Sequence, residues 1–417
     1  MTEVLLEPSQ KVGALSFLRI TAWATYDLAN TIFSINIVSL YFPLWVIQDH
    51  HGTDLLYAAF ASGSIFIASL FMPFLGTLSD HLQKRMVFLI PTTLLCIGAT
   101  ACLSRSNSLT GGLIFFAIAN CGYQLGLLFY DSLLPEIGSE KIMGRVSGFG
   151  VTLGYLGTLI GLALVRPFVL AKGHQAAFLP TAIFFLLFSL PCFCFVRDRK
   201  RPSLPTAGFS LYQATSERFQ KGFSHFKKGS PLRQFASVHF FSLLAIQPVI
   251  LFMSIYTQKV IGLDDDQMIV FFFLTTCFAI LGSFAAGFLT DRLGAWKIFA
   301  LSLAGWVIGF SCAIVAREKW HFWISGGLIG MVLGSTWVSG RVLVIRFSPP
   351  EHIGEVFGCL GLVGRLAAIL GPLGWGAIIW GFNAFFPWNY RLALLCLLVC
   401  MLISLSLFLK KVPKDLF

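Results

Sequence analysis

The sequence predicts an all-α membrane protein whose twelve transmembrane helices form two pseudo-symmetric bundles of six. Three observations lead to this prediction: an apolar composition, twelve long apolar runs, and a repeat that relates the two halves of the chain. Mean hydropathy is +0.80. Charged residues make up 12 % of the 417 residues, against about 25 % in a typical water-soluble domain. A chain with this balance is expected to fold in a lipid bilayer.

Twelve apolar runs are long enough to span a bilayer, because crossing the hydrocarbon core takes about 20 mainly apolar residues. The expected helices lie near residues 18–46, 56–76, 86–104, 111–133, 146–169, 178–196, 234–258, 268–289, 298–316, 322–346, 355–381 and 389–409. The first run is long, and the eleventh is broken by Gly371, Pro372 and Gly374. No cleavable signal peptide is evident before the first run, so that run is expected to stay as an anchor.

A repeat divides the chain into two halves. Residues 144–161 match residues 354–371 at six positions with an offset of 210, and "GTLSDHLQKR" matches "GFLTDRLGAW" at an offset of 211. The sequence therefore predicts parallel six-helix bundles at residues 1–196 and 234–417. Internal symmetry of this kind is typical of secondary transporters, whose substrate site lies between the repeats near the bilayer midplane.

Residues 197–233 are expected to form a basic cytoplasmic linker between the two bundles. After the opening "RDRKRPSLP", aromatic residues recur with a helical spacing at Phe209, Tyr212, Phe219, Phe223 and Phe226. This pattern predicts an amphipathic helix on the cytoplasmic membrane face. A disordered basic loop is the alternative interpretation.

The distribution of Lys and Arg predicts the orientation of the helices. With both termini in the cytoplasm, the cytoplasmic side holds 21 of these residues and the opposite side holds 7. The net charge of +11 then reflects the orientation in the membrane, and it gives no reason to expect nucleic acid as a partner.

The loop between the second and third expected helices resembles the loop signature of the major facilitator superfamily. That signature joins a glycine, an acidic residue and basic residues, which are here Gly76, Asp80, Lys84 and Arg85 in the first copy and Gly287, Asp291, Arg292 and Gly294 in the second. The sequence departs from the signature at His81 and Gln83. The resemblance covers both halves and implies the major facilitator fold, with transport by alternating access.

Three further stretches are similar to one branch of that superfamily, the vacuole effluxers, also called autophagy-related amino-acid effluxers. They are "WATYDLAN", "LLPEIGSEKIMGRVSGFGVTLGYLG" and "SGRVLVIRFSPPEHIGEVFGCLGLVGRLAAILGP". The resemblance implies a secondary active transporter that exports amino acids or similar zwitterions. The short loops favour the inner membrane of a bacterium. Import of another small metabolite is the alternative, since sequence does not show the direction of transport.

Polar residues inside the expected helices are candidates for the pathway of the substrate or of a coupling proton. A charge in hydrocarbon costs about 2.5 kcal/mol or more, so it normally faces a cavity or a partner. Asp27 and Asp131 are the acidic residues well inside a span, and Arg341 and Arg365 are the basic ones. Helical spacing places further polar side chains beside the acidic residues. The candidate pathway residues are Asp27, Asn30, Asn120, Gln124, Asp131, Arg341 and Arg365.

Three roles are open for Asp27. It could carry the driving proton, because burial raises the affinity of a carboxylate for protons. It could bind the amine of a zwitterionic substrate whose carboxylate meets Arg341 or Arg365. It could instead pair with Arg341 to brace a cytoplasmic gate.

The loop signature is expected to form a cytoplasmic gate. Asp80 would dock against the positive N-terminal end of the eleventh span, which is expected to begin at Ser348, with Arg85 or Arg145 as a bridge. The gate candidates are Gly76, Asp80, Lys84, Arg85, Arg145, Asp291 and Arg292.

Other functional classes receive less support. The eight histidines are dispersed and the ten cysteines show no metal-ligand spacing, so no metal or other cofactor is expected and the cysteines are interpreted as free thiols. A membrane-embedded enzyme would need clustered acids, bases or ligands, and a receptor or scaffold gains nothing from the repeat. The expected protein is a monomeric transporter in contact with lipid, with protons as a candidate coupling ion.

Overall fold

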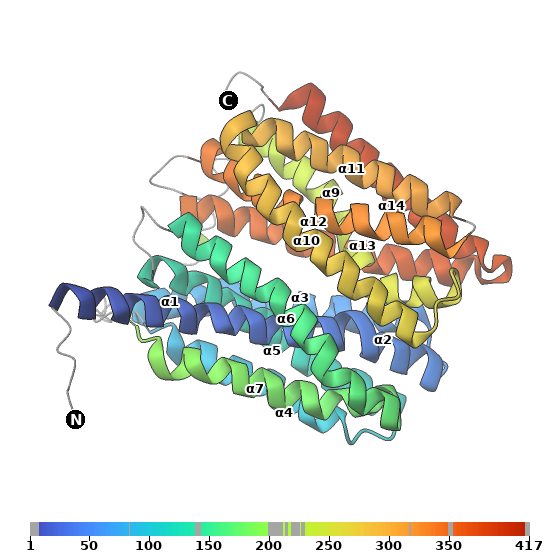
Figure 1. The fold of residues 1–417 in the computed structure, drawn as a ribbon, viewed down its shortest axis with the longest axis horizontal. Coiled ribbons are helices and arrows are strands. Elements are labelled where there is room, and N and C mark those ends of the chain that lie inside the picture. The colour runs from blue at the N-terminus through green and yellow to red at the C-terminus, as the bar shows by residue number, and fades with distance from the viewer. Residues whose placement is uncertain are drawn as a thin grey trace. The chain divides into compact units, whose positions relative to one another are not determined.

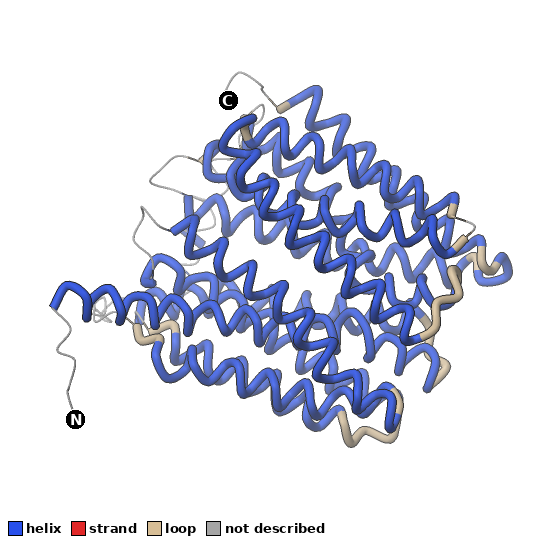
Figure 2. Tube along the Cα trace, in the orientation of Figure 1, coloured by secondary structure: helices blue, strands red, loops and turns tan. Residues whose placement is uncertain are grey.

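The computed structural model describes residues 8–82, 84–137, 143–198, 212, 216–217, 226, 230–316, 318–348 and 353–412. These residues form helices and connecting loops and no strand (Figures 1 and 2). Twelve helical segments are long and apolar enough to cross a membrane, which confirms the predicted fold class.

The principal helices agree with the expected runs, with ends that differ by several residues. They are α1 (Pro8–Phe33), α3 (Asp54–Leu82), α4 (Met86–Leu103), α5 (Leu109–Ile137), α6 (Met143–Lys172), α7 (Phe178–Phe195), α9 (Pro231–Lys259), α10 (Asp265–Leu293), α11 (Ala295–Val315), α12 (Lys319–Phe347), α13 (Ile353–Gly381) and α14 (Trp388–Lys411).

The first span is not a uniform α-helix. After α1 the chain continues as a π-helix at Ser34–Tyr41, a short α-helix, α2, at Phe42–Leu44, and a second π-helical turn at Trp45–Asp49. Each hydrogen bond of a π-helix spans five residues rather than four. Face assignments made with α-helical spacing therefore hold only for the part of the span before Ser34.

The eleventh span is continuous, in contrast to the predicted break. Pro372 lies inside α13, which runs from Ile353 to Gly381. A proline removes one backbone donor from a helix, and membrane helices tolerate this where neighbouring groups satisfy the freed carbonyl.

Two compact units make up the chain. Unit 1 comprises Met1–Ile37 and Phe71–Phe209, and unit 2 comprises Val38–Leu70 and Ser210–Phe417. The bundles predicted from the repeat remain a statement about sequence symmetry. In the structure, the end of the first span and the start of α3 pack with the helices of the second half of the chain.

Close packing of α1 on α6 organises unit 1. A row of glycines on α6 at residues 150, 154, 157 and 161 faces α1, and a Cβ atom at Gly157 would collide with the backbone of Leu28. The amide of Asn36 donates to the carbonyl of Gly161 at 3.4 Å. The glycines thus let the two helix backbones approach as helices in membranes often do.

The same packing recurs in unit 2 between α9 and α13. A Cβ atom at Gly371 would lie 2.7 Å from the carbonyl oxygen of Leu244. Gly371 is the repeat partner of Gly161 at the offset of 210 residues. The sequence repeat therefore coincides with a repeat of helix packing.

Most of the predicted amphipathic helix at residues 197–233 lies outside the described residues. The beginning of this linker is described and packs within unit 1. The side chain of Arg19 donates to the carbonyl of Arg197 at 2.8 Å, and Asp198 binds the start of α4 as set out below. The linker therefore begins as part of unit 1.

Candidate functional site

Asp27 lies in α1 directly against the backbone of α6. Its side chain is half-buried, and a Cβ atom at Gly154 would lie 3.2 Å from its Oδ2 atom and 3.2 Å from the hydroxyl of Thr31. That hydroxyl donates to the carbonyl of Asp27 at 2.8 Å. Gly154 therefore leaves just enough room for a carboxylate at this point of the helix interface.

Two tyrosines of α5, Tyr123 and Tyr130, lie near this carboxylate. Tyr130 stacks on Trp23 with ring centroids 4.6 Å apart and on Tyr26 at 5.0 Å. Tyr123 and Tyr130 are both near enough to Asp27 and Asp131 for electrostatic interaction. The structure therefore brings the two predicted intramembrane acids of unit 1 to the same pair of tyrosines.

The hydroxyl of Tyr130 is buried and has no hydrogen-bond partner among the residues that the structure describes. An unsatisfied buried hydroxyl is unfavourable, and it could accept or donate a hydrogen bond to a polar guest. The tyrosines were missed at the sequence level, because nothing in their spacing separates them from ordinary aromatic packing residues.

The other pathway candidates of unit 1 differ in exposure. Asn30 in α1 and Asn120 in α5 are buried, with 3 % and 2 % of their surface exposed. Gln124 is half-buried and Asp131 is exposed on α5. Helical spacing thus placed these residues on the correct helices, but Asn30 and Asn120 lie within the packing of unit 1.

The two cationic candidates in unit 2, Arg365 and Arg341, differ in burial. Its side chain is half-buried and folds back along α13, so that a Cβ atom at Gly361 would lie 3.3 Å from its guanidinium. Arg341 is exposed on α12. The interaction of Asp27 with either arginine remains a prediction.

His239 on α9 occupies the place in unit 2 that Asp27 occupies in unit 1. A Cβ atom at Gly364 would lie 3.1 Å from Cδ1 of Leu243 and 4.0 Å from Nε2 of His239. Gly364 is the repeat partner of Gly154, which faces Asp27. His239 also stacks on Phe235 with ring centroids 6.0 Å apart. The sequence repeat does not reveal this place of His239, because its matched stretches do not include α9.

The structure describes the gate candidates in part. Gly76 is half-buried near Leu128, and Lys84 is exposed whereas Arg85 is half-buried. Asp80 lies in the last turns of α3 and Arg145 in the first turn of α6, but their side chains lie outside the described part. The docking of Asp80 on α13 therefore remains a prediction.

The second copy of the signature lies on the surface of unit 2. Asp291 and Arg292 are exposed at the end of α10, and the guanidinium of Arg292 lies 4.1 Å from the ring centre of Phe288. The predicted helix start at Ser348 is wrong in one respect. The hydroxyl of Ser348 donates back to the carbonyl of Val344 at 2.6 Å, because the residue ends α12.

Asp198 provides an unpredicted contact at the first copy of the signature. Its carboxylate accepts hydrogen bonds from the backbone N–H groups of Arg85 at 2.9 Å and Met86 at 3.2 Å. A carboxylate at a helix N-terminus is favoured by the helix dipole. The residue was assigned to the linker because its partners lie more than 100 residues earlier in the chain.

A candidate metal centre is not found among the described residues. No group of three or more His, Cys, Asp or Glu side chains there could hold a metal ion. The ten cysteines are free thiols, of which Cys102 and Cys194 are exposed and Cys96, Cys192 and Cys359 are buried.

Comparisons with known proteins agree on family and fold. The family model of the Major Facilitator Superfamily matches residues 28–297 and 235–416. The uncharacterized MFS-type transporter YxiO of Bacillus subtilis (strain 168) is 25 % identical over 377 residues, which are 84 % of this chain and 86 % of that protein. An uncharacterized protein of Aquifex aeolicus (strain VF5) is 25 % identical over 97 % of this chain and 98 % of its own.

Solved structures of transporters share the fold. A bacterial homolog to the human lysosomal transporter Spinster superposes with a TM-score of 0.72 at 12 % identity and covers 98 % of both chains. The nucleoside transporter NupG, with one substitution, gives 0.75 at 13 % identity over 95 % of this chain and 100 % of its own. The human organic anion transporter MFSD10 gives 0.68 at 16 % identity over 97 % and 100 %.

Proposed function

Because the chain belongs to the Major Facilitator Superfamily and is thus a membrane transporter, we propose that it exports amino acids or similar zwitterions. The observation that carries this proposal is the Asp27 carboxylate, held half-buried against α6 at Gly154 and beside Tyr130. A carboxylate in this position can accept a charge-assisted hydrogen bond from a substrate amine.

Arg365 in unit 2 supplies the complementary charge. A zwitterion carries an ammonium and a carboxylate, and a guanidinium binds a carboxylate through two parallel hydrogen bonds. The resemblance of three stretches to the vacuole effluxers supports the same substrate class.

The solved relatives do not decide the substrate. Their names describe a homolog of a lysosomal transporter, a nucleoside transporter and an organic anion transporter, which shows how many solutes one fold can serve. Function has to be inferred from the residues of the site. For this chain the residues proposed for substrate binding are Asp27, Tyr130 and Arg365.

Protons are the proposed coupling ion. The membrane setting makes the charged form of Asp27 costly unless a cation or a hydrogen-bond donor compensates it. A carboxylate of this kind can take up a proton on one side of the membrane and release it on the other. The bacterial relatives support an inner-membrane location, and the 21-to-7 distribution of Lys and Arg supports cytoplasmic termini.

Reconstitution into liposomes with labelled solutes tests the proposal. The panel contains neutral amino acids, organic anions, organic cations and nucleosides, with an imposed proton gradient present or absent. We expect gradient-driven movement of amino acids and competition only by molecules that keep both charged groups. Equal transport of a nucleoside or of a singly charged anion would overturn the assignment.

A further inference from the structure

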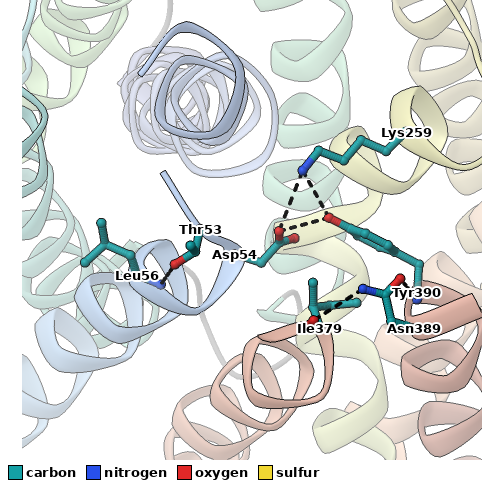
Figure 3. Close-up of polar contacts among 7 residues, drawn as sticks. All are labelled: Thr53, Asp54, Leu56, Lys259, Ile379, Asn389 and Tyr390. Atoms are coloured by element: carbon teal, nitrogen blue, oxygen red, sulfur yellow. Dashed lines mark hydrogen bonds and ion pairs between the residues drawn. The ribbon is translucent and has the colours of Figure 1, made fainter. Parts of the chain in front are cut away.

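A buried polar cluster lies in unit 2 where the starts of α3 and α14 meet the end of α9. Asp54 at the start of α3, Lys259 at the end of α9 and Tyr390 near the start of α14 meet there (Figure 3). The hydroxyl of Tyr390 donates to Oδ2 of Asp54 at 2.9 Å. The ammonium of Lys259 lies 4.0 Å from that oxygen and donates to the Tyr390 hydroxyl at 3.3 Å.

Burial makes this cluster more than a surface ion pair. Asp54 is 4 % exposed, whereas the Lys259 side chain is 33 % exposed and reaches solvent. The ring of Tyr390 lies among other buried aromatic rings, with Trp375 at 6.2 Å and Tyr256 at 6.5 Å between centroids. A buried carboxylate is tolerated only when it is paired and hydrogen-bonded.

Two further hydrogen bonds join the first two spans to helices of unit 2. The hydroxyl of Ser254 in α9 donates to the carbonyl of Ser39 at 2.7 Å. The hydroxyl of Ser62 in α3 donates to the carbonyl of Ile369 in α13 at 3.0 Å. These hydrogen bonds add to the apolar contacts that hold residues 38–70 against the second-half helices, such as the contact between the rings of Tyr57 and Phe252.

We infer that Asp54, Lys259 and Tyr390 form a polar lock that closes this end of the protein and opens once in each transport cycle. The inference rests on the proposed transport function. Two features support this inference. The contacts join segments that are far apart in the chain, and water molecules can replace each hydrogen bond when the segments separate. A permanent structural contact would be expected to bury hydrocarbon in place of an ion pair.

Unequal burial predicts an unequal response to mutation. Lys259→Met would leave the buried Asp54 carboxylate without its positively charged partner, which strongly disfavours the closed state. Asp54→Asn keeps an acceptor for the Tyr390 hydroxyl and lets the Lys259 side chain turn to solvent. This variant should therefore destabilise the closed state less than Lys259→Met does. The double variant removes both charges and should recover most of the loss.

A designed cysteine pair reports closure directly. A Cβ atom at Gly376 in α13 would lie 3.2 Å from the Cβ atom of Ala58 in α3 and 2.7 Å from the Cα atom of Leu55. A slight separation of the two helices would relieve the contact with Leu55 and bring the two Cβ atoms to the separation of about 3.5–4.5 Å found in disulfides. The pair Ala58→Cys and Gly376→Cys, in a background without native cysteines, should cross-link under mild oxidation. Cross-linking should stop transport, and reduction should restore it.

The lock variants are then combined with the cysteine pair. Lys259→Met should slow cross-linking by about tenfold or more, because an unpaired buried charge costs several kcal/mol. Asp54→Asn should slow it less, and the double variant should return toward the parent rate. Lys319→Met is the matched control, since Lys319 is an exposed lysine that donates to Gln267 at 2.9 Å outside the cluster.

The outcomes separate the lock from the substrate assignment, because cross-linking needs no substrate. Equal cross-linking rates in the parent, Lys259→Met and Lys319→Met proteins would overturn the lock even if amino acids are transported. Full transport by the cross-linked protein would overturn it as well. Normal lock behaviour without amino-acid transport would instead reject the substrate class.

Discussion

At the scale of single residues, the two halves place chemically different side chains at one position of the repeat. Gly154 faces Asp27, and its repeat partner Gly364 faces His239. Both side chains are half-buried and both can exchange a proton. The repeat therefore conserves the space for a polar side chain while the charge type differs between the units.

Asp27→Asn separates the roles open to this residue. If Asp27 binds the substrate amine, loss of one charge-assisted hydrogen bond should weaken binding by about tenfold to a hundredfold, and exchange between equal pools of substrate should fail. If Asp27 carries the proton, uphill transport should be lost while exchange continues, because exchange needs no net proton movement.

Binding of labelled substrate and exchange in liposomes are the measurements for this variant. Asp266→Asn is the matched control, because Asp266 is exposed in the first turn of α10. Arg365→Ala should also reduce binding, whereas Arg105→Ala in an exposed loop should not. Unimpaired uphill transport by both Asp27→Asn and Arg365→Ala would remove these charges from the mechanism.

Some of the functional candidates could be recognised from the sequence and others could not, for a physical reason. Asp27 and Arg365 stand out because a charge within an apolar run is costly wherever the run packs. Asp54 lies at the edge of a run, so its burial depends on Tyr390, 336 residues later. No local pattern contains that information, and the same holds for Asp198 at the start of α4.

At the scale of helices, each unit contains a pair of helices whose backbones pack closely at glycine residues. A Cβ atom at Gly157 would meet the backbone of Leu28, which cannot turn aside as a side chain can. The spacing of the α6 glycines was visible in the sequence, and the structure shows α1 as their partner. The π-helical part of the first span was not predictable, because the apolar pattern there suits an α-helix equally well.

Gly157→Ala should force α1 and α6 apart. Insertion of a methyl group into a tight interface costs about 1–3 kcal/mol, so the thermal unfolding temperature of the purified protein should fall. Gly98→Ala in α4 is the matched control, because a Cβ atom there has nothing within 4 Å. It should leave stability unchanged or raise it slightly, since alanine favours helix formation. Equal melting temperatures for both variants would contradict the packing described for α6.

Asp198→Ala should weaken the start of α4. Removal of a capping carboxylate typically costs about 0.5–2 kcal/mol, and the N–H groups of Arg85 and Met86 would lose their acceptor. Hydrogen exchange at the first turn of α4 should accelerate, while the middle of the helix should keep its protection. Unchanged exchange at Arg85 and Met86 would show that the cap contributes nothing to the helix start.

At the scale of the whole molecule, twelve spans and the family were predictable from apolar run length and the repeated loop signature. The division into units was not. The repeat assigns residues 38–70 to the first half, whereas their contacts lie in unit 2. The repeat reflects the similarity of the two halves in sequence, whereas the units reflect which residues are in contact in this conformation.

Orientation in the membrane remains a prediction from the charge distribution. Ser210→Cys, in the linker, should resist a membrane-impermeant thiol reagent applied to intact cells and react after the cells are opened. Asn107→Cys, in an exposed loop at the opposite helix ends, should react in intact cells. Labelling of position 210 from outside would reverse the assigned topology.

The assignment of residues 38–70 to unit 2 bears on how the chain could be divided for expression. A cut within the linker would separate the buried rings of Tyr57 and Phe252, which lie 5.6 Å apart in an edge-on contact. Residues 1–198 expressed alone would therefore expose aromatic side chains that are buried in the full chain, and we expect this fragment to aggregate or be degraded. Made together with residues 230–417, the same fragment would find its missing surfaces, so fragment complementation should succeed where separate production fails.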